Sequence, residues 1–104
     1  MNTPTITLHV GWINLSVEFM KLYVKNLKFC SLYWDETKRV LGISFYSDDS
    51  EVSKRYSINR KSNPGNIPCA AFLRDLNLPR SSYKNYDKFD VDLVRDNVVF
   101  NIQL

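Results

Sequence analysis

Residues 88–104, KFDVDLVRDNVVFNIQL, carry the strongest structural signal in the chain. Phe89, Val91 and Leu93 alternate with charged residues, and this period of two is typical of a strand with one buried face. Polar residues at 95–97 favour a turn, and beyond them apolar residues alternate again. The stretch therefore predicts a β-hairpin.

A second hairpin is predicted earlier in the chain. Residues 28–34 are strand-like, residues 35–38 form a polar turn, and residues 39–46 are rich in β-branched and aromatic residues. Both predicted hairpins therefore have two strands of similar length joined by a short polar turn.

A short helix is predicted before each hairpin. The first begins after Ser16, a residue type favoured as an N-cap, and carries apolar residues at helical spacing. The second begins at Pro68, whose fixed φ suits the first helical position, and ends before Pro79. Further strands are expected ahead of the helices, at residues 5–10 and 54–59.

The order strand, helix, hairpin thus occurs twice, in residues 5–46 and in residues 54–104. The two halves share few residues, so duplication is inferred from the order and length of the elements, and the same order is also common in unrelated α+β proteins. Residues 60–66, rich in Asn, Pro and Gly, are expected to form a loop. We predict a single α+β domain over residues 1–104, a β-rich small barrel built from two such units with two short helices.

The composition is that of a globular domain, with 104 residues, 44% hydrophobic and 24% charged. The longest apolar run, residues 69–73, is far shorter than the roughly 20 residues of a membrane-spanning helix. Residues 1–5 lack the basic and apolar segments of a secretory signal. We therefore expect a cytoplasmic protein without a membrane partner.

Few residues in the chain suit metal binding or redox chemistry. Cys30 and Cys69 allow at most one bridge, whereas secreted domains that depend on disulfides usually carry about four cysteines or more. Both are therefore expected to be reduced packing residues. With His9 as the single histidine and no Cys-x-x-Cys spacing, a zinc site has too few ligands. We expect no metal and no cofactor.

No arrangement of residues points to catalysis. Asp48, Asp49 and Glu51 lie in a predicted polar turn, where the burial that raises a carboxyl pKa is not expected. Ser81 and Ser82 have no base nearby in the sequence, and the three glycines are too far apart for a phosphate-binding loop. The sequence predicts a protein that is not an enzyme.

Residues 65–78, GNIPCAAFLRDLNL, form the most distinctive motif. Together with the hairpin that follows, they resemble the core motif of the AbrB-like swapped-hairpin transcription regulators and antitoxins, in which a Gly precedes an Ile-Pro step and a short helix. Residues from Gly11 onward resemble the same motif, with Ser16 at the position of the Pro. The resemblance implies DNA binding, and it implies that one chain supplies both units of a pseudo-dimer.

Charge distribution adds a candidate surface for such binding. The formal net charge is +3, and residues 54–61 hold four positive charges and no negative one. Because Lys and Arg neutralise phosphates, these residues are the best candidates for nucleic-acid contacts. The candidates are Lys54, Arg55, Asn59, Arg60 and Lys61, with Lys38, Arg39 and Arg80 as outlying support.

Other interpretations of these features stay open at this point. A basic strand and loop also occur as a simple solvated face. The many tyrosines and the two tryptophans suit cross-strand packing, a stacking platform for single-stranded nucleic acid, or a protein interface. The alternative function is therefore a small protein-interaction module, such as an inhibitor or an accessory protein of a mobile element. Open sheet edges would also permit a homodimer in place of a monomeric pseudo-dimer.

Overall fold

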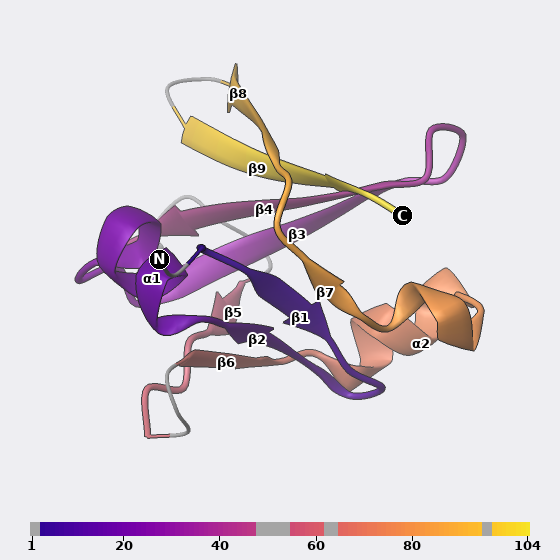
Figure 1. Ribbon diagram of the computed structural model, residues 1–104, viewed down its shortest axis with the longest axis horizontal. Coiled ribbons are helices and arrows are strands. Elements are labelled where there is room, and N and C mark those ends of the chain that lie inside the picture. Colours follow the sequence, from indigo (N-terminus) through magenta and orange to yellow (C-terminus); the bar gives the residue numbers. More distant parts are fainter. Residues whose placement is uncertain (1–2, 48–54, 62–64, 95–96) are drawn as a thin grey trace.

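Two antiparallel sheets and two short helical segments make up the computed structural model, which describes residues 3–47, 55–61, 65–94 and 97–104 (Figure 1). The four-stranded sheet consists, in spatial order, of β6 (Gly65–Pro68), β2 (Trp12–Leu15), β1 (Ile6–Leu8) and β7 (Asn85–Tyr86). The five-stranded sheet consists of β5 (Tyr56–Ser57), β3 (Phe29–Asp35), β4 (Val40–Tyr46), β9 (Asn97–Gln103) and β8 (Asp90–Val94). The predicted α+β class is confirmed.

The core consists of the facing apolar sides of the two sheets. In the four-stranded sheet Ile13 pairs with Ile67, and in the five-stranded sheet Leu41 pairs with Ile102, and all four side chains are fully buried. Burial of a side chain of this size stabilises a fold by roughly 1.5–3 kcal/mol. In β2, β6, β4 and β9 these residues form the expected buried face, whereas Val91 and Leu93, whose alternation predicted a buried face for β8, are 57% and 71% exposed.

The first helical segment begins where the sequence predicts. Ser16 caps α1 (Val17–Phe19) through its hydroxyl, which accepts a hydrogen bond from the backbone N–H of Phe19 at 3.2 Å and another from that of Thr5 at 2.9 Å. The chain continues as a π-helical turn, η1 (Met20–Val24). The ring of Phe19 packs at 5.4 Å from the ring of Phe100, which joins this segment to the five-stranded sheet.

The second helix, α2 (Ala70–Leu76), begins later than predicted. Pro68 is the last residue of β6 and pairs with Trp12, so the prediction that it starts the helix is wrong. The expected loop over residues 60–66 is wrong in part for the same reason, because pairing with β2 draws Gly65 and Asn66 into a strand. A left-handed Asn77, with φ of 54°, ends α2.

Both predicted hairpins are confirmed. Strands β3 and β4 pair from Phe29 and Tyr46 to Asp35 and Val40, and β8 and β9 pair with Val91 opposite Phe100. Residues 95 and 96 of the second predicted turn lie outside the described residues. A short 3-10 turn, η2 (Arg80–Ser82), and strand β7 precede this hairpin.

Strand pairing follows the same scheme in both halves of the chain. Pairs β2–β6 and β4–β9 join one half to the other, and hairpin β3–β4 corresponds to hairpin β8–β9. Pair β1–β7 corresponds to pair β5–β3, and β1–β2 corresponds to the isolated bridge between Asn59 and Asn66. The two halves therefore have corresponding pairings, in which β7 and β8 together correspond to β3. One bridge in the second half corresponds to the three-residue ladder β1–β2 in the first.

A closed barrel, which the sequence led us to expect, is not formed by the described strands. Among the described residues, a single bridge between Asn59 and Asn66 links the two sheets on one side. On the other side β7 pairs with β1 and β8 pairs with β9, while residues 87–89 between them belong to no strand. This break in the ladder leaves two sheets where a barrel was predicted.

Gly65 is required by close packing against Met20. A Cβ atom at Gly65 would lie 2.5 Å from the Met20 sulfur, whereas one at Gly11 would meet Ala70 at an ordinary 3.7 Å. We expect Gly65→Ala to lower the free energy of unfolding by about 1–3 kcal/mol. Gly11→Ala is the matched control and should be neutral, or stabilising by about 0.4–1 kcal/mol. Urea unfolding followed by tryptophan fluorescence measures both, and equal effects of the two substitutions would contradict this packing.

Candidate nucleic-acid interface

Most of the predicted basic segment lies at one end of the molecule, beside the chain that joins η1 to β3. The Arg55 guanidinium lies over the Phe29 ring, 4.7 Å from its centroid, and Arg60 donates a hydrogen bond to the backbone oxygen of Leu27. Asn59 accepts a hydrogen bond from the backbone N–H of Lys61 at 2.9 Å, which holds the turn after β5. Lys54 lies outside the described residues.

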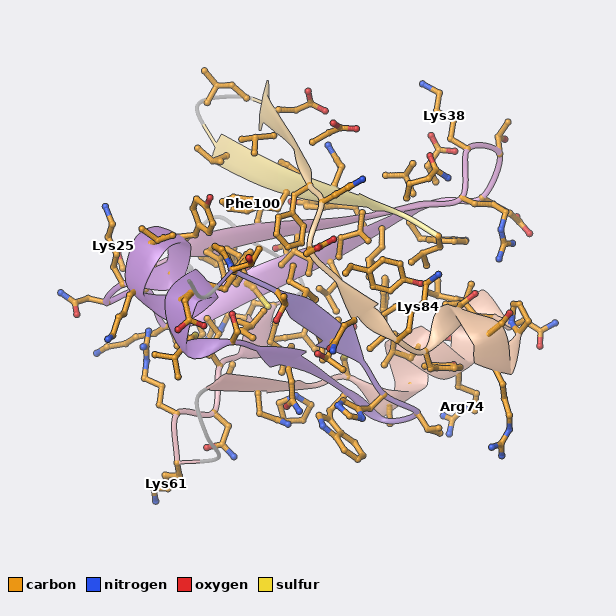
Figure 2. The ribbon with its side chains drawn as sticks, in the orientation of Figure 1. Lys25, Lys38, Lys61, Arg74, Lys84 and Phe100 are labelled. Atoms are coloured by element: carbon orange, nitrogen blue, oxygen red, sulfur yellow. The ribbon has the colours of Figure 1, made fainter. Side chains whose placement is uncertain are left out.

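The outlying candidates are not brought to the same place. Lys38 and Arg39 belong to the turn between β3 and β4, and Arg80 begins η2. Figure 2 shows Lys38 at the upper right and Lys61 at the lower left, at opposite ends of the molecule. The eight predicted residues therefore do not form one surface, because the hairpin β3–β4 carries its turn away from β5.

The outer face of the four-stranded sheet is rich in asparagine. Residues on its strands alternate between the core and this face, since Asn14 pairs with Thr7 on one side and with Asn66 on the other. We call this surface the asparagine face, and it consists of Thr7, His9, Trp12, Asn14, Asn66, Pro68 and Asn85.

Side chains on the asparagine face contact one another through hydrogen bonds and ring stacking. The Asn66 amide donates to the Asn14 side-chain oxygen at 3.0 Å, and the Asn14 amide lies 3.1 Å from His9 Nε2. His9 in turn stacks on Trp12, with ring centroids 4.6 Å apart and planes inclined by 12°. The result is an ordered row of amide, imidazole and indole groups, with Trp12 40% exposed at its end.

Electrostatics distinguish the outer faces of the two sheets. The four strands of the asparagine face contain no Asp or Glu. Arg60 and Lys61 directly follow Asn59, whose backbone pairs with Asn66. Figure 2 shows Lys61 and Arg74 at the lower left and lower right, the side on which the four-stranded sheet lies. Basic side chains thus border a surface of neutral hydrogen-bonding groups.

The outer face of the five-stranded sheet is different. It contains a groove of about 690 Å³ lined by Tyr33, Trp34, Asp35, Lys38, Val40, Gly42, Asp90, Asp92, Asn101 and Gln103. Three carboxylates and one lysine give this groove a negative charge. Asn101 donates to Asp92 at 2.7 Å, and Gln103 donates to the backbone oxygen of Lys38 at 2.8 Å. We call this surface the acidic groove, and its charge disfavours nucleic acid.

Sequence reasoning placed neither Asn14 nor Asn66 in the interface. The two residues are 52 positions apart, and only the β2–β6 pairing brings their amides together. The signal that could have identified them is the alternation of Ile13, Leu15 and Ile67 with polar residues, which predicts an outward polar row once both segments are recognised as strands.

The two cysteines are buried free thiols. Burial raises the pKa of Cys30 from 9.0 to about 12, with the charge of Cys69 as a smaller cause, and burial raises the pKa of Cys69 to about 12 as well. Both groups are therefore protonated at neutral pH and poor nucleophiles. Among the described residues, no group of three or more His, Cys, Asp or Glu side chains is arranged to hold a metal ion.

Comparison with protein-family models, with curated proteins and with solved structures gave no match. In the part of the chain that the structure describes, no helix has the length and apolar character needed to cross a membrane.

Raised thiol pKa values predict a stability that falls at high pH. Unfolded thiols lose their protons near pH 9 while the folded ones keep theirs to about pH 12, so the folded state binds more protons between these values. The free energy of unfolding should therefore decrease as the pH rises from about 9 to about 12. Urea unfolding at a series of pH values measures it, and a Cys30→Ala, Cys69→Ala double variant should show a shallower decrease.

Thiol labelling at pH 8 provides an independent check. Both cysteines should react with a disulfide reagent far more slowly in the folded protein than in urea. Labelling at equal rates in the two states would contradict the burial of these residues.

Proposed function

We propose that this protein is a non-enzymatic DNA-binding regulatory domain that contacts DNA through the asparagine face and the neighbouring basic residues. The observation that carries this proposal is the Asn14–Asn66 pair on a sheet face whose strands contain no carboxylate. Amide side chains read base edges, adenine in particular, through paired hydrogen bonds. Basic residues beside them supply the attraction to phosphates.

Phosphate contacts are assigned to Arg60 and Lys61 at one end of this face and to Arg74 at the other. All three side chains are exposed. Arg60 already donates to the backbone oxygen of Leu27, which fixes the direction of its guanidinium, whereas Lys61 is exposed next to the turn that Asn59 holds. The asparagine face thus has basic residues at both ends and neutral polar side chains between them. This arrangement suits a nucleic acid, whose phosphates run in a continuous line along the backbone.

The pairing scheme supports the resemblance to the AbrB-like regulators. We infer that residues 5–46 and 54–104 are duplicated units, because exchange of the halves preserves the pairings of the described strands, except that a single bridge between Asn59 and Asn66 corresponds to the β1–β2 ladder. Asn14 and Asn66 then lie across the pair β2–β6 that joins the two units. A pseudo-twofold surface of this kind suits DNA sites with related half-sites.

The absence of catalysis is part of the same proposal. Cys30 and Cys69 are buried and protonated, Ser82 is buried, and His9 is engaged by Trp12 and Asn14. Of the other candidates, Ser81 is exposed in η2, and Asp48, Asp49 and Glu51 lie outside the described residues. Single-stranded nucleic acid is the alternative ligand for the same face, because the His9–Trp12 stack offers an aromatic surface to an unpaired base.

Fluorescence anisotropy with a labelled duplex and with the single strand of the same sequence tests this function. Binding should weaken steeply between roughly 50 and 200 mM salt. Lys61→Glu should weaken binding to all sequences alike. It should also reduce the slope of the logarithm of the binding constant against the logarithm of the salt concentration by about 1. Lys38→Glu makes the same change in charge at the opposite end and should have a smaller effect.

Two results would overturn the proposal. The first is no binding of either nucleic acid at low salt. The second is an equal loss of affinity in Lys61→Glu and Lys38→Glu, since it would show that net charge and not the asparagine face determines binding. A preference for the single strand over the duplex would favour the alternative ligand.

A further inference from the structure

Strand β8 lies at an edge of the five-stranded sheet. Among the described residues it pairs with β9 and with no other strand. Every second residue of an antiparallel edge strand directs its backbone N–H and C=O away from the sheet, where they are available to a further strand. The β8 edge is therefore able to extend the sheet.

One side of β8 exposes apolar side chains. Val91 is 57% exposed and Leu93 is 71% exposed, and Val98, opposite Leu93 on β9, is 45% exposed. Val91 pairs with the buried Phe100, so this row lies on the same side of the sheet as the core. These three side chains therefore lie on the core side of the sheet, beyond the buried core, where they are exposed to solvent.

The other side of β8 exposes acidic side chains. Asp90 and Asp92 point to the outer face of the sheet and line the acidic groove together with Asp35. Tyr33, which is 52% exposed, lines the same groove. Strand β8 thus presents carboxylates on one face and apolar side chains on the other, in strict alternation.

We propose that the β8 edge binds an extended segment of a partner protein in which basic and apolar side chains alternate. Its backbone would pair with β8, its Lys or Arg side chains would lie over the acidic groove near Asp90 and Asp92, and its apolar side chains would cover Val91 and Leu93. Charge complementarity selects this occupant, because cross-strand pairs of opposite charge stabilise a ladder and like charges destabilise it.

The same charges disfavour a second copy of this chain. In a two-fold antiparallel pairing of β8 with itself, opposite residues share a face, so Asp90 and Asp92 would meet the carboxylates of the other copy. Nucleic acid is disfavoured at this edge for the same electrostatic reason. The proposal is also independent of DNA binding, because the asparagine face belongs to the other sheet.

A blocked, fluorescently labelled peptide of about seven residues, in which lysine and valine alternate, is the probe. We expect saturable binding by anisotropy, with amide chemical-shift changes in β8 and the acidic groove. A peptide of the same composition with lysines and valines in separate blocks, and one in which glutamate replaces lysine, are the matched controls. Both should bind at least about tenfold more weakly, because neither satisfies both faces of the strand at once.

Surface substitutions in β8 test the two faces separately. Asp90→Asn with Asp92→Asn should weaken peptide binding roughly 2- to 30-fold and reduce its salt dependence. Asp75→Asn, an exposed change on α2, is the control. Val91→Thr with Leu93→Thr should weaken binding about tenfold, whereas Val10→Thr, at another exposed valine, should not. None of these side chains is buried, so the fold should be retained.

Three results would each overturn the proposal. They are equal binding of the alternating and the blocked peptide, chemical-shift changes confined to other strands, and concentration-dependent self-association through β8 at neutral pH. Loss of peptide binding in the Asp90, Asp92 variant without loss of DNA binding would separate this site from the asparagine face.

Discussion

Pairing between the two halves of the chain is the constraint on which the rest of the structure depends. Strand β2 pairs with β6 and β4 pairs with β9, and these pairs align Ile13 with Ile67 and Leu41 with Ile102 in the core. The alternation of a strand then dictates what lies outside. Asn14 and Asn66, the neighbours of Ile13 and Ile67 along their strands, therefore point to the outer face. On β4 the neighbour of Leu41 is Gly42, which has no side chain and so leaves room for Asn101 on the outer face. Both outer surfaces therefore follow from the apolar contacts that stabilise the core.

The two outer surfaces differ in charge, and this difference organises the proposed functions. The asparagine face has neutral amides between cationic residues, whereas the acidic groove has carboxylates beside an exposed aromatic ring. A chain with a net charge of only +3 is a weak polyanion binder if its charges are evenly spread. Separation of the charges gives one face for an anionic ligand and another for a basic one. The two hairpins nevertheless differ at the surface, since β8 presents Asp90 and Asp92 to the outer face of the sheet, whereas β3 presents Tyr33 and Asp35 there.

Sequence patterns predicted the parts of the fold that depend on local chemistry. Alternation predicted the hairpin β8–β9, β-branched and aromatic composition around a polar turn predicted the hairpin β3–β4, and the hydroxyl of Ser16 predicted the start of α1. Features set by long-range pairing were missed. Pro68 has the residue type of a helix start, but its pairing with Trp12 makes it the end of a strand. Among the predicted site residues, Arg60 and Lys61 lie next to the asparagine face. Lys38 and Arg39 follow the seven-residue strand β3, whose length places Lys38 at the opposite end of the molecule from Lys61. The Asn14–Asn66 contact, between residues 52 positions apart, is set by the register of β2 and β6.

A heteronuclear NMR titration of the isotope-labelled protein with a short DNA duplex would distinguish the two outer surfaces. We expect the side-chain amide signals of Asn14 and Asn66 and the backbone signals of Arg60 and Lys61 to shift together, while those of Asp90 and Asp92 stay in place. Shifts centred on the acidic groove, or shifts spread evenly over both sheets, would contradict DNA binding through the asparagine face.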